Sequence, residues 1–248
     1  MKDTRIIMGM PISIEIVDSI GSEDAIEKTF AYFVSVDERF STYKHDSEIM
    51  RINRGEIGGP EYTTQTRQVF ALAEQTKKET HNYFDIKKPD GSLDPSGIVK
   101  GWAIQQAAVQ LSDKGYANFY IDVGGDIQSQ GVNASGETWS VGIRNPFNLP
   151  EIVKVIYPRG LGVATSGTYI RGQHIYNPHA LGEKLTDIVS LTVIGPNILE
   201  ADRYATGAFA MGRDGVYFIE TLSGFEAYAI DSDGIATMTT GFEMYTKK

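Results

Sequence analysis

The sequence of 248 residues contains no cysteine. Disulfide bridges, thiolate nucleophiles and cysteine-ligated zinc or iron-sulfur sites are therefore excluded. Long apolar runs are also missing: no segment approaches the roughly 20 apolar residues that cross a bilayer, and the N-terminus has no apolar core of signal-peptide length. We expect a protein without a membrane span that acts in the cytoplasm; a chain trimmed of an export signal would have the same sequence.

Common signatures of nucleotide-binding and hydrolytic enzymes are absent too. The chain has no G-x-x-x-x-G-K-[ST] phosphate loop, no G-x-G-x-x-G turn, no H-E-x-x-H motif and no G-x-S-x-G elbow. The formal net charge of -9 argues against a nucleic-acid partner, because wrapping a phosphate backbone requires a basic face. An anionic ligand would need locally placed cations or a bound metal.

Hydrophobic periodicity predicts an α+β fold, and the lack of any linker-like tract predicts one domain over residues 1–248. Strands outnumber helices without strict alternation, which indicates a largely antiparallel sheet with flanking helices. Ser96 and Asn197 are the expected N-caps of two helices. The expected helices cover 22–34, 64–78, 96–114, 197–212 and 215–222, and the expected strands cover 12–16, 119–123, 139–143, 153–157, 168–172 and 188–194, with a closing hairpin of 226–231 and 235–245.

Asp202 and Thr206 lie four residues apart in a predicted helix, so a carboxylate and a hydroxyl project from one face. Both are hard oxygen ligands, and Mg²⁺ favours such ligands together with backbone carbonyls, waters and substrate phosphates. The same spacing also fits an exposed aspartate beside a threonine that bonds to its own helix. Spacing alone favours that structural interpretation.

Two short segments have the form of ligand-binding turns. Residues 94–97, Asp-Pro-Ser-Gly, lead into a predicted helix whose free N–H groups and positive dipole end can meet an anion, and Lys100 adds a charge in its first turn. Gly124-Gly125-Asp126 follows a predicted strand, where a ligand can approach the backbone and Asp126 can accept hydrogen bonds. Taken alone, the first pattern is more typical of a capping turn, and a plain tight turn explains the second equally well.

His174 is the histidine with the most informative neighbours. Thr165-Ser166-Gly167 and residues 174–178, His-Ile-Tyr-Asn-Pro, bracket a predicted short strand, so hydroxyls and an imidazole can converge at one end of a sheet. The other three histidines sit among charged or loop residues. For His174 taken alone, a hydrogen-bonded structural role is the better interpretation.

The order and chemistry of these motifs together resemble the ApbE family along nearly the whole chain, from about Met8 to Gly212 and again in the last hairpin. The resemblance rests on Met8-Gly9, Phe40-Ser41-Thr42-Tyr43 with Asp46-Ser47-Glu48 and Asn53, Phe84-Asp85, residues 94–101, Gly124-Gly125-Asp126, Thr165-Ser166-Gly167, residues 174–178 and residues 201–207.

The resemblance implies a magnesium-dependent enzyme that transfers the FMN half of FAD, through a phosphoester bond, to a threonine of an acceptor flavoprotein and releases AMP. It implies that Asp202, Thr206 and the backbone carbonyl of Gly97 hold the metal. His174 matches the family histidine by position and is our candidate base for the incoming threonine. The implied flavin contacts are Met8, Tyr43, Phe84, Asp85, Asp94, Lys100, Asp126 and Tyr176.

Two alternatives remain open, a magnesium-dependent FAD pyrophosphatase that gives FMN and AMP, and a FAD-binding module without turnover. The chain departs from the family pattern where only residues 86–93 separate Phe84-Asp85 from the Asp-Pro-Ser-Gly turn, in place of a long insertion. This predicts that one wall of the flavin cleft is shortened or supplied by another chain. Asn177 stands in place of the usual Asp and Met10 in place of the usual Thr, and neither is an implied metal ligand.

Overall fold

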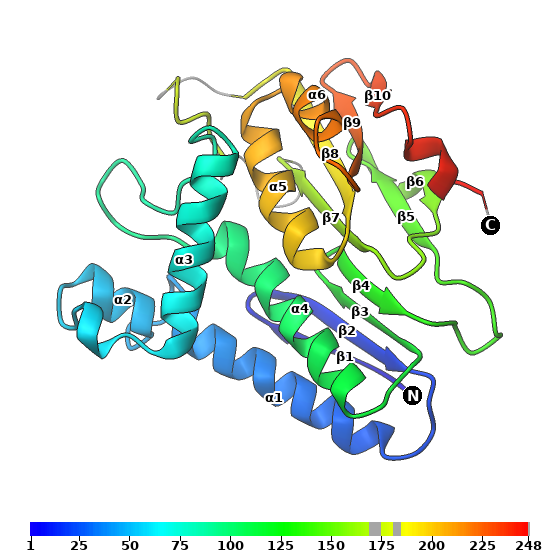
Figure 1. Ribbon diagram of the computed structural model, residues 1–248, viewed down its shortest axis with the longest axis horizontal. Coiled ribbons are helices and arrows are strands. Elements are labelled where there is room, and N and C mark those ends of the chain that lie inside the picture. The colour runs from blue at the N-terminus through cyan, green and yellow to red at the C-terminus, as the bar shows by residue number, and fades with distance from the viewer. Residues whose placement is uncertain (169–174, 181–184, 248) are drawn as a thin grey trace.

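The computed structural model describes residues 1–168, 175–180 and 185–247. Its centre is a sheet in which each pair of neighbouring strands is antiparallel (Figure 1). The α+β prediction with a largely antiparallel sheet is therefore confirmed. The strand order across the sheet is β1 (Lys2–Ile7), β2 (Met10–Ile16), β3 (Phe119–Val123), β4 (Asp126–Gln130), β7 (Gly162–Gly167), β8 (Ile188–Gly195), β9 (Glu226–Asp231) and β10 (Ala236–Met238).

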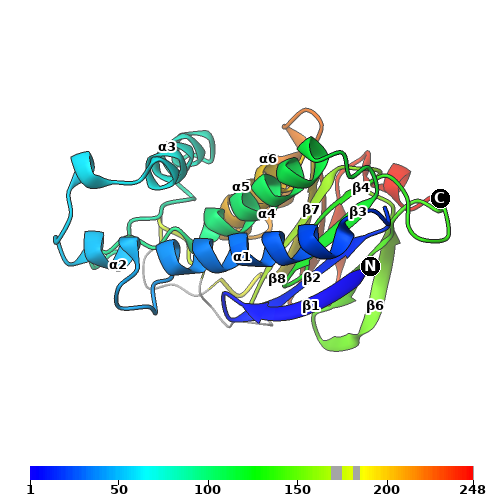
Figure 2. The ribbon, with the colours of Figure 1, turned by 90° about the horizontal axis from the view of Figure 1, so that it is seen from below.

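Helices cover one face of this sheet. α1 (Ser22–Phe40), α4 (Ser96–Asp113) and α5 (Ile198–Ala210) bury their apolar residues against it, and Ile12 and Ile14 alternate out of β2 into the same core. Figures 1 and 2 show the remaining N-terminal helices projecting beyond one end of the sheet. These are α2 (Glu48–Asn53), the 3₁₀ turn η1 (Gly59–Glu61) and α3 (Thr64–Glu79), whereas α6 (Asp214–Glu220) follows α5.

A two-stranded ribbon covers part of the other face. It consists of β5 (Val141–Asn145) and β6 (Asn148–Ile156), and it packs with the 3₁₀ turn η2 (Phe242–Tyr245) on apolar side chains of β4, β7, β8 and β9. Ile143 and Ile156 are the main buried contacts from the ribbon. The sheet is thus enclosed by helices on one side and by this ribbon on the other.

Most local expectations are confirmed, and three are corrected. Asn197 caps α5, since its Oδ1 accepts the N–H of Glu200 at 3.0 Å. Ser96 is not an N-cap: α4 already begins there, and Asp94 Oδ1 accepts its N–H at 3.1 Å. The strand expected at 168–172 is wrong at Thr168, which is a bend, while 169–172 lie outside the described residues.

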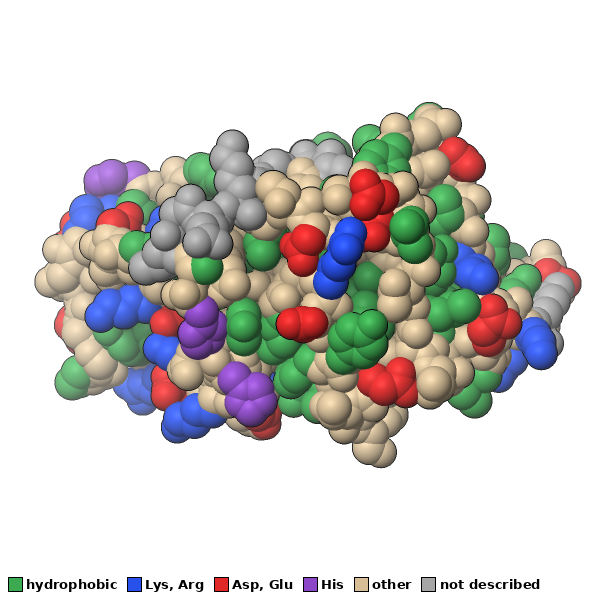
Figure 3. Space-filling view, turned by 90° about the horizontal axis from the view of Figure 1, so that it is seen from above, with side chains coloured by type: hydrophobic (Ala, Val, Ile, Leu, Met, Phe, Trp, Pro, Cys, Tyr) green, Lys and Arg blue, Asp and Glu red, His purple; other side chains and the backbone are tan. Residues whose placement is uncertain are grey.

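β7 ends at Gly167, directly before the range of that expected strand. The last strand of the closing hairpin, β10, is shorter than expected and ends at Met238. The sequence patterns also missed β1, β4 and α2. In the part of the chain that the structure describes, no helix is long and apolar enough to cross a membrane. The face shown in Figure 3 carries scattered Lys and Arg among acidic side chains, and its described residues form no continuous basic tract.

Candidate active site

A cleft of about 870 Å³ lies between the ribbon, the β1–β2 and β3–β4 turns and the beginning of α4. Its volume is within the range of sites that hold cofactor-sized ligands. The structure brings almost all of the described site residues together here. Those that line the cleft are Met8, Tyr43, Phe84, Asp85, Asp94, Gly97, Lys100, Tyr176, Asp202 and Thr206.

One described residue of the predicted set, Asp126, does not line the cleft. Asp126 is 1% exposed and lies behind the wall, where it contacts Lys100 and β7, so its predicted flavin contact stays a prediction. His174 lies outside the described residues, and its role as a base likewise stays a prediction.

Glycines on α4 allow α5 to approach it closely. Gly97 and Gly101 are one turn apart on α4 and contact Thr206 and Asp202, which are one turn apart on α5. A Cβ atom at Gly101 would lie 2.6 Å from Cβ of Asp202, and one at Gly97 would lie 3.1 Å from Cγ2 of Thr206. Any larger residue would separate the helices. The helix crossing therefore brings the Gly97 carbonyl and the two α5 side chains to one place.

Two of the oxygen atoms at this crossing have a spacing compatible with ligands of one magnesium ion. Thr206 Oγ1 donates to the carbonyl oxygen of Gly97 at 3.2 Å, close to the separation of about 2.9 Å between neighbouring oxygens of an octahedral Mg²⁺. Asp202 Oδ2 accepts the N–H of Gly101 at 2.7 Å. Among the described residues, no group of three or more His, Cys, Asp or Glu could hold a metal. The candidate set has a single carboxylate, which suits Mg²⁺ that also binds substrate phosphates.

Two buried charged side chains, Lys100 and Asp126, lie beside Asp202. Lys100 Nζ is 2.6 Å from Asp126 Oδ2 and 3.8 Å from Asp202 Oδ1, and Asp126 Oδ1 accepts the N–H of Thr165 at 3.0 Å. Burial raises the pKa of Asp202 to about 7, Lys100 opposes that rise, and Asp126 adds to it. Among the described residues of this cluster, the carboxylates of Asp126 and Asp202 share the ammonium group of Lys100, so acidic groups outnumber basic ones.

The predicted flavin contacts form the surrounding walls. Met8 has φ of 56° in the two-residue turn between β1 and β2, a backbone conformation that bulky residues rarely adopt. Burial, followed by the charges of Asp85, Asp90 and Asp94, raises the pKa of Tyr176, so the phenol faces these carboxylates. Tyr43 is 97% exposed at the rim and is free to contact a ligand.

Residues 86–93 form a compact turn of this chain. A β-bridge joins Lys87 to Leu93, and the Asn53 amide donates to the Leu93 carbonyl at 2.9 Å and accepts the Leu93 N–H at 2.8 Å. Lys88 in the turn lines the cleft. The shortened segment thus contributes directly to the wall, and Asn53, noted in the sequence only as part of a motif, fixes its closing residue.

Several cleft residues were missed by sequence reasoning. Tyr120 and Asp122 alternate with the apolar residues of β3 and line the cleft on the face opposite the helices, a signal that was available in the strand pattern. Asp122 Oδ1 accepts the N–H of Gly125 at 2.8 Å, and burial raises its pKa. Arg144 lines the cleft from the ribbon. No local pattern could place it, because the packing of the ribbon on the sheet is a tertiary contact.

Comparisons with known proteins agree with this architecture. The chain is 30% identical over 163 residues to the FAD:protein FMN transferase of Salmonella typhimurium, covering 62% of this chain and 47% of that protein. In this match and in two others at 30–31% identity, the chain spans about half the length of the curated relative. The FAD:protein FMN transferase of Haemophilus influenzae is 23% identical over 322 aligned positions, covering 99% of this chain and 93% of that protein.

A solved structure, the flavin transferase ApbE from Vibrio cholerae, has the same fold, with a TM-score of 0.86 at 23% identity, covering 99% of this chain and 98% of that chain. The model of the ApbE family matches residues 8–87 and 87–229. The two matched segments meet at Lys87, inside the compact turn of residues 86–93. The match covers far more than half of the sequence, and the chain belongs to the ApbE family.

Proposed function

We propose that this protein is a magnesium-dependent FAD:protein FMN transferase, which attaches FMN to a threonine of an acceptor flavoprotein and releases AMP. The observation that carries the proposal is the convergence of the Gly97 carbonyl, Asp202 and Thr206 beside buried Lys100 in one cleft. The printed names of the relatives, FAD:protein FMN transferase and flavin transferase, support the same reaction.

The charges of the cleft support a need for a divalent cation. Among the described lining residues, the four carboxylates of Asp85, Asp94, Asp122 and Asp202 outnumber the three cations of Lys88, Lys100 and Arg144. The pyrophosphate of FAD would bring further negative charge into this already anionic site. A bound Mg²⁺ would offset that charge and stabilise the negative charge that develops on the phosphates during transfer.

The residues divide into two groups by role. Gly97, Asp202 and Thr206 would hold the metal, and Lys100 beside them would contact the flavin nucleotide at its phosphates. The flavin half would contact Phe84, which packs against Gly97, and the other lining residues that carry flavin-binding predictions. These are Met8, Tyr43, Asp85, Asp94 and Tyr176.

The nucleophile belongs to the acceptor. Its threonine Oγ forms a bond to the phosphorus of the FMN half, the bond from that phosphorus to the bridging oxygen breaks, and the oxygen leaves with AMP. His174, beyond the described residues, is the proposed base that takes the threonine proton, a contribution of about 10²- to 10⁴-fold.

One observation favours hydrolysis as the second candidate function. Tyr43, which lines the cleft at its rim, is 97% exposed, so water reaches that part of the described wall. Water in place of the threonine would give FMN and AMP. The two reactions therefore differ only in which hydroxyl enters the cleft.

Product analysis separates these functions. The protein is incubated with FAD and Mg²⁺, with and without an acceptor domain, and AMP, FMN and flavinylated acceptor are quantified. A transferase releases one AMP for each acceptor modified, a pyrophosphatase releases FMN and AMP without acceptor, and a binding module turns over nothing. We expect Asp202→Ala to lose about 100-fold or more in turnover, because the metal loses the single carboxylate that the described candidate ligands supply. Asp113→Ala, an exposed residue at the end of α4, is the matched control.

A further inference from the structure

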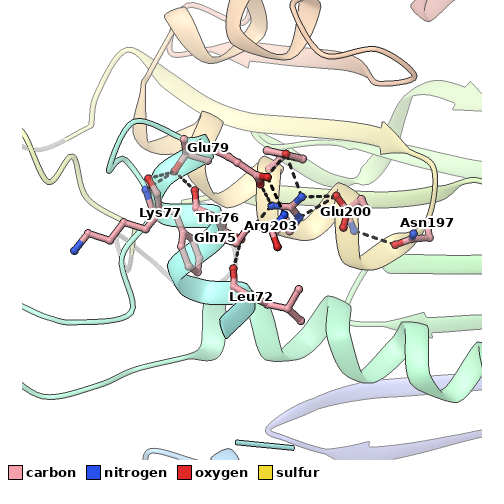
Figure 4. Close-up of polar contacts among 11 residues, drawn as sticks. Leu72, Gln75, Thr76, Lys77, Glu79, Asn197, Glu200 and Arg203 are labelled. Atoms are coloured by element: carbon pink, nitrogen blue, oxygen red, sulfur yellow. Dashed lines mark hydrogen bonds and ion pairs between the residues drawn. The ribbon is translucent and has the colours of Figure 1, made fainter. Parts of the chain in front are cut away.

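Arg203 is a buried arginine that the proposed chemistry does not use. It directly follows Asp202 on α5 and is 4% exposed. Figure 4 shows its guanidinium group between Glu200 of its own helix and the C-terminal turn of α3, where Thr76 and Glu79 lie. A buried arginine in this position requires partners for its charge and for its N–H groups.

Each of the five N–H donors of Arg203 meets an acceptor. Nε and Nη2 donate to Glu200 Oε2 at 2.9 and 2.6 Å, and Nη2 also donates to the Tyr204 hydroxyl at 3.1 Å. Nη1 donates to Thr76 Oγ1 at 3.3 Å and to Glu79. The Tyr204 hydroxyl in turn donates to Glu79 Oε2 at 3.0 Å. The bonds to Glu200 and Tyr204 orient the guanidinium group on α5, and the two Nη1 bonds join it to Thr76 and Glu79 of α3. A lysine could supply only three donors.

The end of α3 that Arg203 contacts also reaches α5 and α4, the two helices that carry the candidate metal ligands. Thr80, directly after α3, packs against Gly207 of α5, where a Cβ atom would lie 2.6 Å from Cγ2 of Thr80. Thr80 Oγ1 accepts the N–H of Phe84 at 3.1 Å, and the Phe84 ring lies against Gly97. The end of α3 therefore contacts α5 directly and reaches Gly97 through one ring.

We propose that Arg203 is a positioning residue, which fixes α5 against α3 so that Asp202 and Thr206 meet the Gly97 carbonyl at the spacing that a metal ion requires. The inference rests on the metal site of the proposed function. Mg²⁺ demands nearly ideal octahedral geometry, so a small shift or rotation of α5 separates the oxygens. Loss of groups that orient metal ligands typically weakens metal binding by about 10- to 100-fold.

The test measures metal binding without turnover. Mn²⁺ binding to the protein alone is followed by electron paramagnetic resonance, with competition by Mg²⁺, and FAD affinity is measured separately in EDTA. Arg203→Lys keeps the charge but loses the fork, and we expect its Mn²⁺ dissociation constant to rise about tenfold or more, with FAD affinity in EDTA within about twofold of wild type. Glu79→Gln, which alters the α3 side of the same contact, should weaken Mn²⁺ binding in the same direction.

Two further variants complete the design. In the double variant Arg203→Lys/Glu79→Gln, the loss of Mn²⁺ binding free energy should be smaller than the sum of the two single losses, because both changes act on one network. Arg213→Lys is the control: Arg213 joins the start of α6 to Asp231 at 2.9 Å and lies outside this network, so its Mn²⁺ affinity should equal that of wild type. If Arg203→Lys does not fold, the Mn²⁺ affinity of Glu79→Gln decides whether the positioning role stands.

The outcomes distinguish this inference from the proposed function. Wild-type Mn²⁺ affinity in folded Arg203→Lys overturns the positioning role and leaves the proposed function standing. Equal weakening of metal and metal-free FAD binding shows a merely structural role and also overturns it. A wild-type protein that binds neither Mn²⁺ nor Mg²⁺ removes the metal site, and the inference with it.

Discussion

Asp202 is a buried carboxylate that competes with Asp126 for the ammonium group of Lys100. Lys100 Nζ lies closer to Asp126, at 2.6 Å, than to Asp202, at 3.8 Å. Among the described residues Asp202 has no cation closer than Lys100, and a buried charge without a close counter-ion destabilises the folded state. Such a residue is typical of a functional site, where a ligand supplies the missing charge.

This position gives a stability prediction. Folding raises the pKa of Asp202 from 3.8 to about 7. The ionised side chain therefore destabilises the folded state increasingly as the pH rises through that interval, and the full destabilisation remains at higher pH. Asp202→Asn removes the charge and keeps an oxygen for the Gly101 N–H. At pH 8 in EDTA we expect this variant to be more stable than wild type by about 1 to 3 kcal/mol, measured by denaturant unfolding.

The same variant should show no stabilisation by Mg²⁺, whereas wild type gains stability as the metal binds the folded state. Asp113→Asn, an exposed carboxyl at the end of α4, controls for loss of surface charge. An Asp202→Asn protein that is less stable than wild type at pH 8 in EDTA would contradict the electrostatic account of this site.

At the scale of elements, the crossing of α4 and α5 forms the candidate metal site. Gly101→Ala would place a Cβ atom 2.6 Å from Cβ of Asp202 and 2.9 Å from the Ile198 carbonyl oxygen. We expect this change to cost about 1 to 3 kcal/mol and to weaken Mg²⁺ binding, because α5 must move away from α4. Thermal unfolding and metal titration check both effects.

Gly59→Ala is the matched control, because a Cβ atom at Gly59 meets nothing within 4 Å. Gly59→Ala should change the free energy of unfolding by less than about 0.5 kcal/mol. It should leave the metal affinity unchanged. A Gly101→Ala protein with wild-type Mg²⁺ affinity would show that the site tolerates separation of the helices.

Elements with strong local signals were predictable from the sequence. Asn197 was recognised as a cap because its side chain acts on a backbone N–H three residues away. β7 was missed because its residues, Gly-Val-Ala-Thr-Ser-Gly, are small and have weak strand preference, and pairing with β8 determines its position. The ribbon was found as strands, but its packing on the sheet depends on tertiary contacts.

At the scale of the whole molecule, the order of the motifs carried more information than any one motif. The Asp202/Thr206 spacing alone favoured an exposed Asp beside a Thr bonded to its own helix, whereas the structure buries Asp202 and bonds Thr206 to Gly97, 109 residues away in sequence. The Arg203 contact with Glu79 spans 124 residues and had no sequence signal at all. Long-range pairs of this kind arise only when α3, α4 and α5 are packed together.

The central claim is that this cleft transfers FMN to another protein. The most direct measurement is the intact mass of an acceptor flavoprotein domain after incubation with the protein and FAD, with Mg²⁺ or with EDTA. We predict a mass gain of one FMN less one water with Mg²⁺, no gain in EDTA, and no gain when the target threonine is replaced by valine. An unmodified acceptor in the presence of Mg²⁺, while FAD is consumed to FMN and AMP, would contradict the account.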